Sequence, residues 1–218
     1  MPVSGLHREV AAIALRAAAP HGFALAGGNA LIAHGIIERA TQDVDVFSDE
    51  QGGVQAAADA VEAALREAGF GTERLDQAGG LGDLFYGMGE ALAEWIITGP
   101  GGEQMMLQLA HFDRARRPVM MDIGPVLDLE DVVGGKVCAL ASRAEPRDYL
   151  DTAAALGRYS LEQVIGFARR LDPGLTDRDF ADAGQRLDRW GDQVFAPFGL
   201  GPPDVARLRK RFAAWPRG

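Results

Sequence analysis

The chain has 218 residues, of which 47% are hydrophobic and 24% charged, a balance typical of a folded globular protein. A net charge of −9 argues against a broad surface that wraps nucleic acid, so we expect any nucleic-acid contact to be local. No apolar run is long enough to span a membrane, and the N-terminal residues lack the pattern of a signal peptide. The single cysteine, Cys138, excludes an internal disulfide, and no Cys/His cluster has zinc spacing. We therefore expect a cytoplasmic protein that contacts no membrane.

The N-terminal half alternates helix and strand signals and then becomes rich in short strand-like runs. The spacing of apolar residues predicts a helix over residues 6–18, a short strand over 23–26 and a second helix over 29–37. Polar and apolar residues alternate over 41–47, which predicts a half-buried strand, and an alanine-rich helix follows over 54–68. Further strand-like runs lie between glycine-rich turns, at residues 71–76, 84–88, 94–98, 105–111 and 119–123. This order predicts a small mixed sheet flanked by helices.

The C-terminal half is predicted to be helical, because strand signals stop after Gly124-Pro125. Helices are expected at residues 129–143, 146–157, 161–171, 176–190 and 203–215, with an irregular link over 195–203. The fold class that follows is α+β, with a sheet-containing core over residues 1–124 and a helical region over 125–218.

Two acidic residues stand out in the strand over residues 41–47. Asp43 and Asp45 are two positions apart, so their carboxylates leave the same strand face about 7 Å apart along it. Two converging carboxylates repel each other, which favours a bound divalent cation. Mg²⁺ suits such a pair, because it takes its remaining ligands from water and substrate phosphates. The alternative is a polar strand face that is open to water.

The glycine pair before the second predicted helix suggests a place for a phosphate. Gly27-Gly28, followed by Asn29, leaves backbone N–H groups free at a helix start, where an anion is stabilised. Arg39 follows that helix and could reach the same charge. The alternatives are a tight turn at the glycines and a solvated surface arginine. Together with Asp43 and Asp45, these residues would form a polyphosphate site.

Two blocks of residues carry a resemblance to a known family. The first runs from Gly27 to Phe47 and reads GGNAL, HG, RAT and DVDVF in order, and the second runs from Leu129 to Asp151 and reads LED, K, AL, R, EPRD and D. Their order and spacing resemble the AbiEii/MenT family of nucleotidyltransferase toxins, within the polymerase-β-like nucleotidyltransferase superfamily. The similarity spans residues 23–157.

This resemblance implies an activity and a set of partners. It implies a nucleotidyltransferase core that uses Mg²⁺, completed by the helical C-terminal region. The reaction implied is transfer of a nucleoside monophosphate from a nucleoside triphosphate to an acceptor hydroxyl, the 3′ end of a tRNA. A toxin of this kind is silenced by a cognate antitoxin protein.

The second block contains the candidate site residues of the C-terminal half. Lys136 lies in an apolar helical segment of a chain whose other basic residues, apart from Lys210, are all arginine. Its ammonium group is suited to the charge that develops on a triphosphate as pyrophosphate leaves. The alternative is a surface lysine that extends to solvent. Resemblance assigns Asp148 and Asp151 to the edge of the site, with Asp148 the preferred catalytic acid, although acids after Pro146 also stabilise a helix start.

The chain departs from the family pattern at two positions. Asn29 stands where relatives carry Ser or Thr. Gln108 stands where the superfamily often places a third carboxylate, and glutamine supplies neither a charged metal ligand nor a general base. His111 or Asp113 would have to compensate, yet Gln108 and His111 are expected on opposite strand faces.

Three functional readings remain open from the sequence. The first is transfer to tRNA, for which the basic residues Arg207, Arg209, Lys210 and Arg211 provide a local phosphate contact, unless they are only a soluble helix face. The second is transfer to a small cationic acceptor, as with aminoglycoside nucleotidyltransferases, which an acidic cleft would attract. The third is a domain that binds a nucleotide or a partner protein without turnover, because of Gln108. Serine or cysteine hydrolysis has no supporting motif.

Overall fold

The computed structural model describes residues 5–39, 41, 43–75 and 91–218. The chain forms two compact units, Met1–Leu129 and Glu130–Gly218, called here the N-terminal unit and the C-terminal unit. The strand expected over residues 84–88 lies outside the described residues. Among the helices of the described ranges, none combines the length and the apolar character that crossing a membrane requires.

The N-terminal unit is built on a mixed sheet, in agreement with the α+β class expected from the sequence. The described strands form a seven-stranded sheet in the order β3-β4-β5-β2-β1-β7-β6. Strand β2 lies inside the sheet, antiparallel to β1 and parallel to β5. The strands are β1 Ala24–Leu25, β2 Asp43–Ser48, β3 Gly71–Arg74, β4 Leu92–Thr98, β5 Gln104–His111, β6 Val119–Met121 and β7 Gly124–Val126.

Alternation along the strands divides the sheet into a buried face and a polar face. Val44 and Val46 of β2 are fully buried, whereas Asp43, Asp45 and Phe47, which alternate with them, are half-buried. The same alternation runs along β4 and β5. The apolar face therefore forms the core of this unit, with fully buried Val44, Val46, Trp95, Ile97, Leu107 and Leu109.

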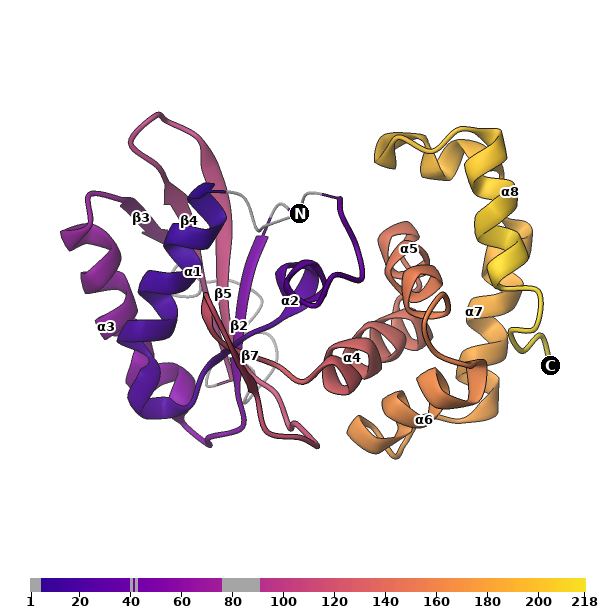
Figure 1. Cartoon of the computed structure of the whole chain (residues 1–218), viewed down its shortest axis with the longest axis horizontal. Helices are drawn as coiled ribbons and strands as arrows, with labels where there is room; N and C mark the ends of the chain where they lie inside the picture. The colour runs from indigo at the N-terminus through magenta and orange to yellow at the C-terminus, as the bar shows by residue number, and fades with distance from the viewer. Residues whose placement is uncertain (1–4, 40, 42, 76–90) are drawn as a thin grey trace. The chain divides into compact units, whose positions relative to one another are not determined.

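Helices α1 (Gly5–Ala17) and α3 (Gly53–Glu67) cover the apolar face and contact each other, while the short helix α2 (Gly27–Ala33) lies on the other side of the sheet (Figure 1). Each long helix is amphipathic: α3 buries Val54, Ala57, Ala58, Val61 and Leu65 at three- and four-residue spacing. A short 3₁₀ turn, η1 (Ala19–His21), joins α1 to β1. Helix α2 contacts β2, the strand that carries the acidic pair.

The C-terminal unit is helical, as predicted. Its helix starts are capped by side chains, for example by the reciprocal pairs Glu145/Asp148 and Ser160/Gln163. Aromatic side chains fill its interior, and the buried Tyr149 hydroxyl donates a hydrogen bond to the Ala183 carbonyl at 2.7 Å. The elements are α4 Leu129–Ser142, α5 Pro146–Ala155, α6 Leu161–Leu171, α7 Asp177–Arg189, the 3₁₀ segment η3 Asp192–Phe198 and α8 Pro202–Arg211.

Several elements differ from the sequence predictions, among them the last helix, expected over residues 203–215, which is α8 and ends at Arg211. The second helix was expected over residues 29–37, but α2 begins at Gly27 and ends at Ala33. Strand β7 begins at Gly124, where strand signals were expected to stop, and pairs in parallel with β1 through Leu25 and Val126. Part of the irregular link is the 3₁₀ segment η3.

Candidate active site

The acidic pair lies on the polar face of the central strand, as the alternation predicted. Asp43 and Asp45 both belong to β2 and are half-buried, with Val44 between them directed into the core. Hard carboxylate oxygens on one face are the donors that Mg²⁺ prefers, so the residues present fit this ion. Within the described residues, no group of three or more His, Cys, Asp and Glu side chains is arranged to hold a metal ion.

Gly27 lies directly against the carboxylate of Asp45. A Cβ atom added at Gly27 would lie 1.7 Å from Oδ2 of Asp45, much closer than any van der Waals contact. Gly27 also has a φ of +58°, a conformation that favours glycine. A backbone hydrogen bond joins the same two segments, because the Ala26 amide donates to the Asp45 carbonyl at 2.8 Å. The glycine is thus required to place Asp45 beside the start of α2.

Asn29 ties α2 to the other acidic residue. Its side-chain amide donates to the Asp43 carbonyl at 2.8 Å, and its own carbonyl oxygen accepts from the Thr41 hydroxyl at 3.0 Å. Gly28 allows the threonine to approach, since a Cβ there would lie 2.3 Å from Cγ2 of Thr41. Asn29 is almost fully buried. It therefore holds the backbone of β2 in place, a task that Ser or Thr would be too short to perform in the same way.

The predicted phosphate-binding segment is arranged differently from expectation. The glycines were expected to precede the helix, but both lie in its first turn, with Ala26 as the capping residue. The helix is also short, so its dipole contributes little. Arg39, half-buried, lies in the connection from α2 to β2. Phosphate binding by Gly27, Gly28, Asn29 and Arg39 stays a prediction.

Gln108 lies beside Asp45, on the strand where a third carboxylate was sought. In the parallel pairing of β2 and β5, Asp45 is opposite Gln108, so both side chains leave the same sheet face. On its other side Gln108 is opposite Glu94 of β4, and its amide nitrogen donates to Oε1 of Glu94 at 2.7 Å. Sequence reasoning missed Glu94, because only the register of β4 against β5 places it in this row.

His111 and Asp113 lie away from the acidic pair. His111 is opposite Ser48, a buried residue of the apolar-face register, whereas Asp45 and Gln108 belong to the polar face. The His111 ring lies 3.1 Å from the carboxylate of Asp113. This confirms the expected opposite faces of Gln108 and His111, and it leaves His111 unable to substitute for a carboxylate at the acidic pair.

In the C-terminal unit, Lys136 of α4 is paired with an acid of α5. Its ammonium nitrogen lies 2.9 Å from Oδ2 of Asp151, and the lysine side chain is 19% exposed whereas that of Asp151 is fully buried. Lys136 is therefore not the surface lysine that the sequence offered as the alternative. The buried carboxylate fixes the position of a single, partly exposed cation.

Asp148 is engaged on both of its carboxylate oxygens. Arg143 donates to Oδ1 at 2.9 Å and to Oδ2 at 3.0 Å, and the Glu145 backbone amide also donates to Oδ2 at 3.0 Å. The bond to Asp148 is the main cause that raises the pKa of the Arg143 guanidinium above its ordinary value. Asp148 thus caps α5 and orients Arg143, so its influence on a substrate would pass through that arginine.

The basic residues of α8 are not equivalent. The Arg209 guanidinium donates to the Leu187 and Trp190 carbonyls, each at 2.6 Å, and Arg207 pairs with Asp204 within the same helix. Lys210 and Arg211 are exposed. A phosphate contact from this helix stays a prediction, and it would involve mainly Lys210 and Arg211 rather than all four basic residues.

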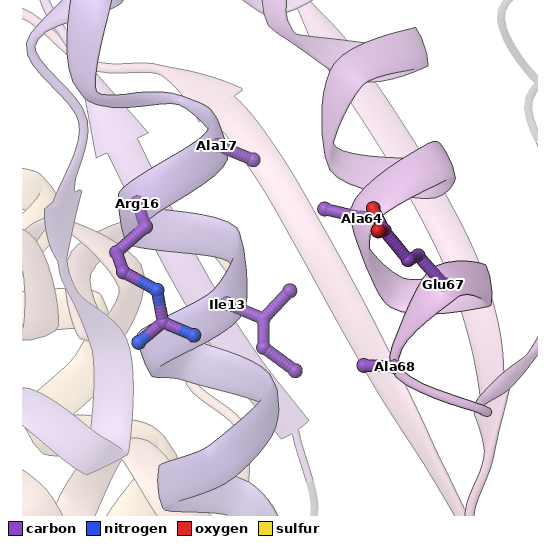
Figure 2. Close-up of a pocket in the computed structure, with 6 residues that line it drawn as sticks. All are labelled: Ile13, Arg16, Ala17, Ala64, Glu67 and Ala68. Atoms are coloured by element: carbon purple, nitrogen blue, oxygen red, sulfur yellow. The ribbon is translucent and has the colours of Figure 1, made fainter.

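One cavity of the N-terminal unit lies apart from the polar face. A cavity of about 410 Å³ opens between α1 and α3, with Ile13 on one wall and Ala64 and Ala68 on the other (Figure 2). These helices cover the opposite side of the sheet from Asp43 and Asp45, so this cavity is separate from the candidate site.

Cys138 of α4 is half-buried, and burial raises its pKa to about 11, which makes it a poor nucleophile.

Comparison with solved structures shows a fold shared with bacterial nucleotidyltransferases. A putative nucleotidyltransferase from Helicobacter pylori matches with a TM-score of 0.60 at 11% identity, over 96% of this chain and 92% of that one. JHP933 from the same organism gives a TM-score of 0.59 at 12% identity, over 97% and 92%. MenT4, a nucleotidyltransferase toxin of Mycobacterium tuberculosis H37Rv, gives 0.51 at 15% identity, over 95% and 82%. No curated protein sequence matches the chain.

The fold is thus one shared with proteins of the nucleotidyltransferase class. The sequence model of one family, described as the nucleotidyl transferase AbiEii toxin of type IV toxin–antitoxin systems, matches residues 10–210. The chain belongs to the AbiEii family of nucleotidyltransferase toxins. Membership implies a nucleotide substrate and a cognate antitoxin partner.

Proposed function

We propose that the protein transfers a nucleoside monophosphate from a nucleoside triphosphate to the 3′-terminal hydroxyl of a tRNA, with release of pyrophosphate. The observation that carries the proposal is the contact between Gly27 and Asp45. It places the start of α2 directly beside the carboxylate of β2. A purely structural polar strand would not need a glycine there. The family and its toxin role support the same reaction.

Asp43 and Asp45 are the residues that would hold Mg²⁺, which when bound neutralises phosphate charge and orients the α-phosphate for in-line attack. Gly27, Gly28 and Asn29 position these carboxylates and leave backbone N–H groups of the first turn of α2 for the triphosphate. Arg39, in the connection from α2 to β2, is proposed to add a positive charge at the same site. In this assignment the N-terminal unit binds the metal and the phosphates.

The C-terminal unit contributes cations. Lys136, held by Asp151, is proposed to stabilise the charge of the departing pyrophosphate. Asp148 is proposed to act by holding Arg143, whose side chain is 45% exposed. The exposed residues Lys210 and Arg211 suit a phosphate backbone such as that of tRNA. The protein's net charge of −9 makes this contact local.

The test is transfer of label from each α-labelled nucleoside triphosphate to total tRNA in the presence of Mg²⁺. The matched variants are Asp43→Asn and Asp45→Asn, which keep the shape of the side chain and remove its charge. Glu73→Gln serves as the control, because Glu73 is an exposed acid on the edge strand β3. We expect transfer by the wild type and the control and at least a 100-fold loss in either aspartate variant, as for removal of a group that stabilises the transition state.

Each alternative reading has its own outcome in this assay. Label that moves to small cationic acceptors but not to tRNA would replace the tRNA proposal with small-molecule modification. Triphosphate binding that needs Mg²⁺ but yields no pyrophosphate would identify a non-catalytic domain. If neither aspartate variant alters binding or transfer, the acidic pair is not the site.

A further inference from the structure

Three polar side chains form a row across adjacent strands of the N-terminal unit. Asp45 of β2 is opposite Gln108 of β5, and Gln108 is opposite Glu94 of β4. Neighbouring strands lie about 4.8 Å apart, and residues in register share a sheet face. Gln108 is therefore the residue between two carboxylates, and it is adjacent to one of the proposed metal ligands.

The hydrogen bond to Glu94 fixes which way the Gln108 amide is turned. An ionised carboxylate only accepts hydrogen bonds, so its neighbour must present the NH₂ group of the amide. The Gln108 amide nitrogen does so, at 2.7 Å from Oε1 of Glu94. The carbonyl oxygen of the same planar amide is then turned away from Glu94, and the next residue of the row on that side is Asp45.

We infer that Gln108 is a neutral metal ligand, through its amide oxygen, and that Glu94 is the positioning residue that presents this oxygen. The inference rests on the proposed function, because it concerns the same Mg²⁺ site. Amide carbonyl oxygens are hard donors and serve as ligands of this kind of cation. Partners in the outer shell that orient a ligand usually affect metal affinity strongly. The row thus supplies a third oxygen without a third charge at the metal.

This arrangement has a consequence for the metal itself. Two carboxylates and an amide would hold a divalent cation with a total ligand charge of −2, which balances the charge of the ion. Glu94 lies behind the amide and contributes its charge only at a distance. We therefore expect weaker metal binding by the free protein than three carboxylates would give.

The experiment measures Mn²⁺ binding to the full chain by electron paramagnetic resonance, without nucleotide. The variants are Gln108→Leu, Glu94→Gln and the combination of both. At position 94 a glutamine offers both a donor and an acceptor, so it no longer fixes the Gln108 amide. Glu73→Gln is the control. Glu73 is an exposed residue of the edge strand β3 and lies on the same sheet face as Glu94. Thermal unfolding of every variant confirms that it is folded.

We expect each single variant to raise the Mn²⁺ dissociation constant about tenfold. The double variant should bind no more weakly than Gln108→Leu alone, because Glu94 acts through the amide. The control should stay within about twofold, since a distant exposed charge is screened by salt. If Gln108→Leu does not fold, Gln108→Glu replaces it and should tighten Mn²⁺ binding.

Three results would overturn the inference. Unchanged binding by Gln108→Leu, or no tightening by Gln108→Glu, removes the amide from the metal site. A further loss when Glu94→Gln is added to Gln108→Leu makes Glu94 a direct ligand instead. If the wild type itself binds no Mn²⁺ and Asp45→Asn changes nothing, the proposed function fails as well, which separates that failure from the failure of Gln108 alone.

Discussion

The ammonium nitrogen of Lys136 lies 2.9 Å from Oδ2 of Asp151, and only the lysine of this pair reaches solvent. The asymmetry predicts unequal effects of removing each partner. Lys136→Met leaves a carboxylate in the interior without this cation, so we expect a loss of about 3 kcal/mol in the free energy of unfolding. Asp151→Asn leaves a lysine that turns to water, and we expect a loss of about 1 kcal/mol.

Urea unfolding of both variants checks this prediction, with label transfer measured in parallel. Both should lower transfer, because Lys136→Met removes the cation and Asp151→Asn releases it from its position. Equal losses of stability would show that the buried carboxylate is compensated by other groups and would remove the basis for the asymmetry.

The second prediction concerns Gly27. Gly27→Ala would place a methyl group 1.7 Å from Oδ2 of Asp45 and would also strain a backbone at φ +58°. Gly35→Ala is the matched control, since Gly35 has φ +70° and no atom within 4 Å of the added Cβ. Each should lose about 1 kcal/mol from backbone strain. Only Gly27→Ala should also weaken Mn²⁺ binding and transfer, and equal behaviour of the two variants would contradict the contact with Asp45.

The third prediction separates a capping role of Asp148 from direct catalysis. Asp148→Ala removes the cap of α5 and the partner of Arg143, so we expect a loss of about 2 kcal/mol in unfolding free energy. Mn²⁺ binding by Asp43 and Asp45 should be unchanged. Arg143→Ala should be at least as destabilising, because it leaves the fully buried Asp148 carboxylate with less compensation. Loss of transfer in Asp148→Ala at unchanged stability would instead assign Asp148 a direct catalytic role.

The fourth prediction concerns pH. Burial, and then the charge of Asp172, raise the pKa of Cys138 from 9.0 to about 11, so the folded state disfavours the thiolate. The unfolded thiol ionises first as pH rises, so this contribution is complete below pH 9.0 and is lost between about pH 9 and pH 11. The loss should be at most about 2 kcal/mol, because the partly exposed thiol is screened by solvent. The free energy of unfolding of Cys138→Ala should fall less steeply with pH over this range than that of the wild type. Parallel curves of unfolding free energy against pH for the two proteins would show that Cys138 does not cause the loss.

Much of the N-terminal unit could be predicted because its signals are local. The alternation of Asp43, Val44, Asp45 and Val46 identifies both the strand and its two faces. The start of α2 was missed because a glycine pair in a sequence indicates a turn before a helix. In the structure the helix already begins at Gly27, which has a positive φ and contacts Asp45. Strand β7 was missed because three residues are too few for a periodic pattern.

The site could be predicted only as far as single segments allow. Asp43, Asp45 and Lys136 stand out by type and surroundings. The pairing of Lys136 with Asp151 depends on how two helices pack, and the bond between Gln108 and Glu94 depends on strand register. Neither relationship leaves a pattern in the sequence of one chain, so these partners required the structure.

The alternation along β2 also ties the core to the proposed site. Val44 and Val46 form the core through the same strand on which Asp43 and Asp45 face outward, with partners on both sides in β1 and β5. A slip of one residue in that pairing would bury two carboxylates and place two valines on the polar face. A chain with that register would lose part of its core and, at the same time, the arrangement of the proposed metal ligands.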